Sequence, residues 1–218
     1  MRLFVCIVLN LFLFNAIGQP PEAQLWRCSL PRLSADERLD ACTAAMTVAP
    51  DDAAPWHNRG LAYLERKEYK AAVMDFTGAL RRSKDAGTHV LRGHAFSELG
   101  EYERALLDLE DALRMAPKSA EAHNALAWLL ATAGTPGFRD GKRALELAKK
   151  ACALSGWANA AHLDTLAAAY AEAGDFAQAV KWQEKALADP SFQGAEQKDA
   201  QARLALYKAR KPYRHVPG

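Results

Sequence analysis

Nucleophilic, redox or metal chemistry in this chain would depend mainly on its four cysteines and six histidines. The histidines are scattered, and His89 and His94 are five residues apart, which is off the spacing that places two ligands on one helix face. His162 and Asp164, two residues apart, would point to different faces of a helix. The motifs H-E-x-x-H, G-x-x-x-x-G-K-[ST], G-x-S-x-G and Cys-x-x-Cys are missing. The sequence therefore predicts no catalytic residue, no metal site and no cofactor.

Cys6 lies within residues 1–18, a stretch typical of a secretory signal peptide. Arg2 precedes an apolar run from Leu3 to Phe14, and Ala16-Ile17-Gly18 has the small-x-small form of a cleavage site. We expect cleavage after Gly18 and a periplasmic or secreted protein. The apolar run is shorter than the ~20 residues of a spanning helix, so no stable membrane span is expected. Retention as an uncleaved anchor is the alternative.

The other three cysteines fit an exported protein. Cys28 and Cys42 are the nearest pair in the chain that would remain after cleavage, and exported compartments are oxidising. We therefore expect a disulfide between Cys28 and Cys42. Cys152 lies beside Ala151 on a predicted helix, where a packed free thiol is expected.

The elements that carry these residues show an internal repeat. Its clearest unit places large and small apolar residues at helical spacing on two successive segments: Trp56, Gly60 and Tyr63, then Ala72, Phe76 and Ala79. The small residues would let two helices approach closely, and the large ones would fill the space beside them. Such a helix pair cannot bury its apolar face alone and needs neighbours.

The same pattern recurs three more times. In the first helix, the small residue Gly60 recurs as Gly93, Ala127 and Ala167, and the large residue Tyr63 recurs as Phe96, Leu130 and Tyr170. In the second helix, Ala72 recurs as Ala105, Ala144 and Ala179, and Ala79 recurs as Ala112, Ala151 and Ala186. The chain therefore resembles the tetratricopeptide-repeat family over residues 53–191, with Arg59 at a position where that family has leucine. The resemblance implies an all-α, right-handed α-solenoid of about four helix-turn-helix units, whose concave groove holds a protein or peptide.

Four repeats are expected, at residues 53–85, 86–119, 120–156 and 160–191. Gly100 and Gly174 stand where a helix end favours a left-handed residue, and Lys67 holds that place in the first repeat. The third repeat has a longer inter-helix loop, residues 133–141, which is either a binding loop or a neutral insertion. In the fourth repeat Gln183 replaces a large apolar residue, which is expected to loosen that position.

Both ends of the repeat array are expected to be covered. At the N-terminal side, residues 19–50, the sequence predicts an extended lead-in over 19–33 and then a helix from Ser34 to Met46. This helix starts with a capping box, and we expect it to form a partial repeat that lacks its first helix. Residues 194–218 predict a capping helix docked through Leu204, Leu206 and Tyr207, followed by a solvated basic tail.

The resemblance implies which side chains line the groove, because the first helix of each pair faces it. The candidates are His57, Asn58, Leu61, His94, Asn124, Trp128, Asp164 and Thr165. An Asn amide can donate to and accept from a peptide backbone. Trp128 is either an anchor for a partner or a packing residue against the next repeat.

The predicted groove carries several carboxylates but no lysine or arginine. Glu65, Glu98, Glu121, Asp164 and Glu172 occupy groove positions, where no Lys or Arg occurs. This argues against a clamp for a carboxylate terminus and favours a neutral or basic segment. The formal net charge of +2 is too small to indicate nucleic-acid binding.

These observations predict a non-catalytic protein- or peptide-binding scaffold of the cell envelope. The alternatives are a structural, self-associating spacer and an accessory subunit of an envelope enzyme complex. The oligomeric state stays open.

Overall fold

The computed structural model describes residues 21–190 and 192–218, which form eleven α-helices and one short 3-10 helix, with no strand among these residues. The signal peptide expected over residues 1–18 lies outside the described residues. The chain divides into two compact units, residues 1–84 and 85–218. The interval predicted as one repeat domain, 53–191, is therefore shared between the two units.

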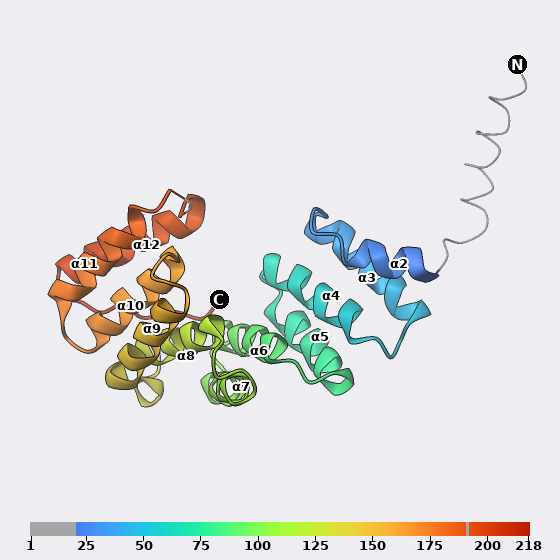
Figure 1. Cartoon of the computed structure of the whole chain (residues 1–218), viewed down its shortest axis with the longest axis horizontal. Coiled ribbons are helices and arrows are strands. Elements are labelled where there is room, and N and C mark those ends of the chain that lie inside the picture. The colour runs from blue at the N-terminus through green and yellow to red at the C-terminus, as the bar shows by residue number, and fades with distance from the viewer. Residues whose placement is uncertain (1–20, 191) are drawn as a thin grey trace, which may run out of the picture. The chain divides into compact units, whose positions relative to one another are not determined.

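Unit 1 contains two helix pairs, and unit 2 contains three pairs and a final helix (Figure 1). The helices of unit 1 are α2 (Pro21–Cys28), α3 (Ala35–Val48), α4 (Ala53–Glu65) and α5 (Tyr69–Arg82). Those of unit 2 are α6 (Ala86–Glu98), α7 (Tyr102–Met115), α8 (Ala120–Thr132), α9 (Gly141–Leu154), α10 (Ala160–Glu172), α11 (Phe176–Leu187) and α12 (Gly194–Lys208). Consecutive helices pack as α4 with α5, α6 with α7, α8 with α9 and α10 with α11. The predicted fold class, an all-α solenoid of helix-turn-helix pairs, is confirmed.

The first helix of each repeat, α4, α6, α8 or α10, begins at a side chain that accepts a backbone hydrogen bond. This residue accepts from an N–H in the first turn that has no partner within the helix, which typically stabilises a helix by about 1 kcal/mol. The four cap residues are Asp52, Asp85, Ser119 and Asn159.

Close helix approach explains the small residue that recurs in the first helix of each repeat. A Cβ added at Gly60 would lie 2.6 Å from a ring carbon of Phe76, and one added at Gly93 would lie 2.9 Å from Leu109. A larger side chain would therefore push α4 from α5 and α6 from α7. Lys67, between α4 and α5, has a φ of 59°, the left-handed conformation that Gly100 adopts between α6 and α7.

An ion pair between a half-buried arginine and a buried aspartate joins the two helices of each of the first two repeats. Arg59 of α4 donates two hydrogen bonds to Asp75 of α5, at 2.7 and 2.8 Å, and Arg92 of α6 donates two to Asp108 of α7, both at 2.7 Å. Arg59 thus stands in place of a leucine because its charge is matched across the helix pair. At the equivalent positions the later repeats have Leu126 with Leu147 and Leu166 with Trp182.

Residues 19–33 are not simply extended, as the sequence predicted, because α2 occupies Pro21–Cys28. Proline is tolerated in the first helical turn, where its missing N–H would have no partner. Leu25 and Cys28 lie one turn apart and pack with Leu33 against Ala41 and Cys42 of α3. The position expected to lack a first helix is therefore filled by a short one. The capping box of α3, Ser34 with Glu37, is present.

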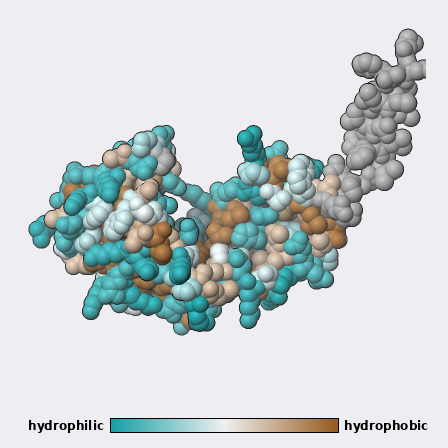
Figure 2. All heavy atoms as spheres, in the orientation of Figure 1, coloured by the Kyte–Doolittle hydropathy of each residue, from teal (hydrophilic) through white to brown (hydrophobic). Residues whose placement is uncertain are grey.

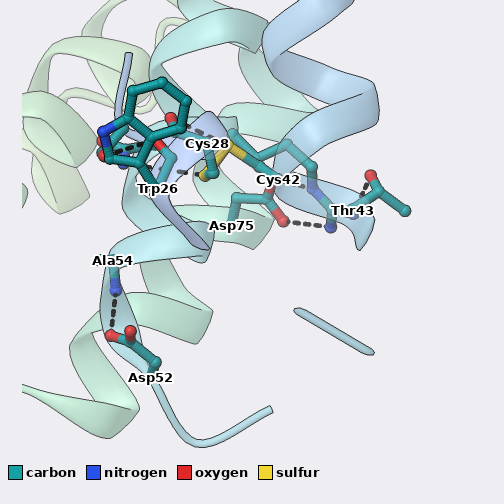
Figure 3. The surroundings of a disulfide bond; sticks show 10 residues. Trp26, Cys28, Cys42, Thr43, Asp52, Ala54 and Asp75 are labelled. Atoms are coloured by element: carbon teal, nitrogen blue, oxygen red, sulfur yellow. Dashed lines mark hydrogen bonds and ion pairs between the residues drawn. A yellow bond between two sulfur atoms is a disulfide. The ribbon is translucent and has the colours of Figure 1, made fainter. Parts of the chain in front are cut away.

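Cys28 and Cys42 form a disulfide that joins α2 to α3 (Figure 3). Both are buried, while Trp26, two residues before Cys28, is exposed. Thr43 and Asp75, which both accept from Arg59, lie close to the disulfide in this view (Figure 3). The disulfide and the Arg59 hydrogen bonds thus connect α2 and α3 to the first repeat.

The loop of the third repeat is held against the protein. It contains a 3-10 helix, Pro136–Phe138, and the ring of Phe138 lies 5.7 Å from that of Tyr102. Arg139 donates to Glu172 at 3.1 Å and to the carbonyl of Ala133 at 2.8 Å. These contacts give the loop a structural role in unit 2.

Candidate peptide-binding groove

Unit 2 contains a cavity of about 630 Å³. Its walls come from the first helices of three successive repeats, α6, α8 and α10, and from α12. We call this cavity and the helix surfaces around it the unit 2 groove. Five of the eight predicted groove residues line it: His94, Asn124, Trp128, Asp164 and Thr165.

The other three predicted groove residues belong to unit 1. The Asn58 amide lies 3.8 Å from the sulfur of Cys28, so α2 covers this position. The ring of His57 packs edge-on against Phe76, with centroids 5.9 Å apart, and Leu61 is half-buried. In unit 1 the face of α4 that was expected to meet a ligand is therefore partly covered by the N-terminal helix.

Asp164 lies at the base of the unit 2 groove and is 6% exposed. Arg203 of α12 donates to both of its carboxylate oxygens, at 3.0 and 2.9 Å, and Gln183 of α11 donates at 2.6 Å. Burial raises the pKa of this carboxyl, while Arg203 and Gln183 favour its charged form. Asp164 therefore ties three helices together and offers no open charge to a ligand.

The expectation about Gln183 was wrong: Gln183 does not loosen its position, because it is fully buried and hydrogen-bonded to Asp164. The expectation about α12 agrees with the structure in part. Tyr207 is buried, as predicted, together with Ala200 and Arg203, whereas Leu204 and Leu206 are only half-buried. A buried arginine 39 residues away from its carboxylate has no signature in sequence spacing.

Trp128 contacts both an arginine and a tyrosine. The guanidinium carbon of Arg203 is 5.2 Å from the centroid of the Trp128 ring, and the Tyr213 ring centroid is 5.8 Å away. Trp128 is half-buried, so part of the indole faces the groove. Its contact with Tyr213 brings the end of the chain onto this surface.

The segment after α12 is not the solvated tail that the sequence predicted. Pro212 to His215 are half-buried, and Tyr213 and His215 line the groove. Arg214 forms an ion pair of 2.6 Å with Glu172, the last residue of α10. We call residues 212–218 the C-terminal tail.

The open part of the groove is acidic. Glu121 of α8 and Glu196 and Asp199 of α12 are exposed and line the cavity. Among the described residues, neither Glu196 nor Asp199 forms an ion pair. Arg203 is the base that the groove gains from α12, and its charge is matched by Asp164. The exposed part of the lining therefore carries negative charge.

Asn124 carries an unused hydrogen-bond acceptor at the wall of the groove. Its Oδ1 atom is buried and has no donor among the described residues. Because this oxygen is out of reach of solvent, an incoming N–H group would bond to it only after the amide turned toward the cavity.

Reactive side chains do not gather in the described part of the chain. No cluster of three or more His, Cys, Asp or Glu residues with metal-binding geometry occurs among residues 21–190 and 192–218. Cys152 is buried, and burial raises the pKa of its thiol to about 11. Within the same residues, no helix is both long enough and apolar enough to cross a bilayer.

Figure 2 shows mainly hydrophilic side chains on the visible face, interrupted by hydrophobic patches. Several large apolar side chains are exposed in the described chain, among them Trp26, Met74, Leu107 and Trp157. Trp157 stacks on Trp182 of α11, with ring centroids 5.3 Å apart. None of these four residues lines the unit 2 groove.

Comparison with known proteins identifies the repeats. Family models described as tetratricopeptide repeat match residues 53–85, 86–119 and 159–189. A search of curated protein sequences found no match.

Solved structures share the fold at low sequence identity. The crystal structure of the APC/C hetero-tetramer Cut9–Hcn1 matches with a TM-score of 0.69 and 16% identity over 80% of this chain, which spans 33% of that chain. TTC0263, a thermophilic TPR protein of Thermus thermophilus, matches with a TM-score of 0.66 and 21% identity over 87% of this chain and 100% of its own. YrrB, a TPR protein with an unusual peptide-binding site, matches with a TM-score of 0.55 and 18% identity over 77% of this chain and 84% of its own. The family matches identify tetratricopeptide repeats in residues 53–119 and 159–189, and these solved structures share the fold.

Proposed function

We propose that this protein is a non-catalytic scaffold that holds an extended segment of a partner protein in the unit 2 groove. The repeats and the fold support a protein-binding role, and the similar protein YrrB has a peptide-binding site. The observation that carries the proposal is the cavity of about 630 Å³ bounded by the first helices of three repeats. Ligand sites in proteins are typically cavities of ~300–1,000 Å³.

Asn124 and Trp128 give this groove the two kinds of contact that a peptide needs. Asn124 lines the cavity, and its amide, once turned toward the cavity, would both donate to and accept from a peptide backbone. Trp128 offers a half-buried aromatic face, and aromatic anchors dominate many interfaces. Asn124 would hold the backbone of the bound peptide, and Trp128 would select one of its side chains.

The charge around the cavity narrows the class of peptide segment that the groove would bind. Because Glu121, Glu196 and Asp199 are exposed around the cavity, a segment bearing Lys or Arg would be attracted and an acidic one repelled. Binding of a basic segment should weaken as salt rises, because exposed charges are screened.

The proposed compartment is the cell envelope or the exterior. The Cys28–Cys42 disulfide is consistent with an oxidising compartment, and residues 1–18 have the pattern of a secretory signal. N-terminal sequencing of the exported protein tests the signal: a chain beginning at Gln19 supports it, and one beginning at Met1 contradicts it.

Partner capture with matched variants tests the function. The mature chain, Asn124→Ala and Glu146→Ala serve as baits for the envelope fraction of the native host, because Glu146 is an exposed carboxylate of α9 outside the groove. We expect a protein retained by wild type and Glu146→Ala but weakened by Asn124→Ala. Equal retention by all three baits would contradict the proposal. Light scattering that shows a concentration-dependent mass of the chain alone would favour the alternative of a self-associating spacer.

A further inference from the structure

The C-terminal tail crosses the ends of three helices that bound the groove. After α12, Arg210 adopts a left-handed conformation (φ 57°) and the chain turns back. The side chain of Arg214 then meets Glu172 at the end of α10, and the N–H of His215 donates to the carbonyl of Thr132 at the end of α8, at 2.8 Å. The N–H of Gly218 donates to the carbonyl of Glu98 at the end of α6, at 3.2 Å.

These contacts use a property that the three helix ends share. The last carbonyls of a helix lack intrahelical partners, and the aligned peptide dipoles place partial negative charge there. The carboxylates of Glu98 and Glu172 add full negative charge at two of the three ends. The row of helix ends therefore suits an extended chain that presents backbone N–H groups and a cation, which is what the tail presents.

The side chains of the tail use the groove as well. Tyr213 lies against Trp128 and 5.6 Å from the guanidinium of Arg203, and burial raises the pKa of its hydroxyl. Arg214 pairs with Glu172, and the His215 side chain is 12% exposed with its Nε2 atom 3.4 Å from Glu98. Tyr213 and His215 thus occupy part of the cavity lining assigned to the partner, and Arg214 binds Glu172 at the adjacent end of α10.

The tail is held by a small set of polar and aromatic contacts. It makes two backbone hydrogen bonds, the Arg214–Glu172 ion pair, the His215–Glu98 contact and the contacts of Tyr213 with Trp128 and Arg203, and Val216 is 79% exposed. Partly exposed ion pairs and single hydrogen bonds each contribute little net stability in water. The tail is tethered, which raises its effective concentration to the millimolar range for a short flexible linker. A tethered weak ligand can occupy a site most of the time and still be displaced.

We propose that the C-terminal tail is a built-in competitor for the unit 2 groove, and that the partner displaces it with an extended segment carrying an aromatic residue next to a base. This inference rests on the proposed function and adds the chemistry of the partner and its regulation. Apparent affinity for a partner is reduced by the fraction of molecules whose groove is closed. Any change that frees the tail would raise that affinity.

Binding of the tail sequence in trans tests the competition. The probe is a fluorescent peptide of residues 211–218, titrated into the mature wild-type chain, Tyr213→Ala/Arg214→Ala and Val216→Ala, with anisotropy as the readout. We expect the double variant to bind about tenfold more tightly than wild type, as for a tail that covers its part of the groove about 90% of the time. Val216→Ala should bind like wild type, and a peptide carrying the same two alanines should not bind. Equal affinity for all three proteins, or no binding to the double variant, would overturn the proposal.

Two further measurements separate the possible failures. Circular dichroism and a thermal melt establish that the double variant is folded. A captured partner that is sensitive to Asn124→Ala but binds the tail variant no better than wild type would overturn the competition and leave the proposed function standing. If no partner sensitive to Asn124→Ala is found, the proposed function fails whatever the tail peptide does.

Light scattering separates an intramolecular tail from an intermolecular one. If the mass of the wild-type particle rises with concentration and that of the double variant does not, the tail binds a second copy, and the intramolecular competition is overturned.

Discussion

The ring of Tyr213 lies against the ring of Trp128, with centroids 5.8 Å apart. One residue belongs to the C-terminal tail and the other to α8, at a position predicted to meet a partner. The contact means that the groove of the free chain is partly occupied by the protein's own aromatic side chain. Loss of either ring should therefore affect both partner binding and tail closure, in ways that can be measured separately.

Trp128→Ala is expected to weaken partner binding by more than ~1 kcal/mol, the usual threshold for an anchor. The indole is half-buried and contacts Arg203 and Tyr213, so unit 2 should fold and melt at a somewhat lower temperature. Titration of the partner into wild type, Trp128→Ala and Trp128→Phe, with melts alongside, measures both effects. Trp128→Phe should retain most of the affinity because it keeps an aromatic face. A large drop in melting temperature with unchanged affinity per folded molecule would show that Trp128 is a packing residue only.

The Arg59–Asp75 pair should respond differently to single and double substitution. Arg59→Leu leaves Asp75, which is 2% exposed, as an unpaired buried charge and is expected to destabilise unit 1 by about 3–5 kcal/mol. Arg59→Leu/Asp75→Leu should recover most of that loss, because apolar replacement of a buried pair is often neutral or stabilising. Urea unfolding followed by a probe in unit 1 measures the difference.

An exposed ion pair, Arg66 with Glu68, provides the control for the Arg59 and Asp75 variants. Arg66→Ala removes a partner of Glu68 on the surface and should cost less than ~1 kcal/mol. If the double variant were as unstable as Arg59→Leu alone, the physical account of the pair would be wrong.

Unit 2 should lose stability as the pH falls below about 6.5, the ordinary pKa of histidine. Burial lowers the pKa of His162 in the folded protein, so the neutral ring is favoured by folding. The stability that the neutral His162 ring contributes is fully present above the pKa of His162 in the unfolded chain. It is lost as the pH falls through the pKa of His162 in the folded protein. Melts at pH 7.5 and 5.5 should differ more for wild type than for His162→Gln. The same difference in both proteins would exclude His162 as the cause.

The cysteines should divide into one linked pair and one inert thiol. Alkylation of the folded chain at pH 8 should leave Cys152 unmodified, because its thiol is buried and its pKa is raised to about 11. Cys28→Ser/Cys42→Ser should destabilise unit 1 by about 3 kcal/mol, the chain-entropy estimate for a separation of 14 residues. Non-reducing peptide mapping and denaturant unfolding measure the two results. A link to Cys152, or no loss of stability in the double variant, would contradict them.

The repeats could be predicted because their information is local. Gly60 and Phe76, or Gly93 and Leu109, lie within one helix pair, and the need for a small residue follows from spacing alone. The capping box of Ser34 and Glu37 could be predicted for the same reason. Helix α2 was missed because eight residues show too little periodicity to distinguish a short helix from a lead-in.

The candidate site was only partly predictable because part of its lining comes from α12 and the segments on either side of it. Positions such as Asn124 and Trp128 follow from the register of the first helices. Arg203 and Tyr213 reach the same surface through α12 and the turn at Arg210, and neither lies on a first helix of a repeat. The basic tail shows only its composition in the sequence, and its contact with Glu172 depends on tertiary structure.

Photo-crosslinking from inside and outside the groove tests the central claim most directly. A benzophenone amino acid replaces Glu121, an exposed residue that lines the groove, or Glu146, an exposed residue that does not. After irradiation in the native host, mass spectrometry identifies the attached peptide. We predict that position 121, and not position 146, attaches to a basic segment of a partner protein. Equal attachment at both positions, or attachment at position 121 only to a second copy of this chain, would contradict the account.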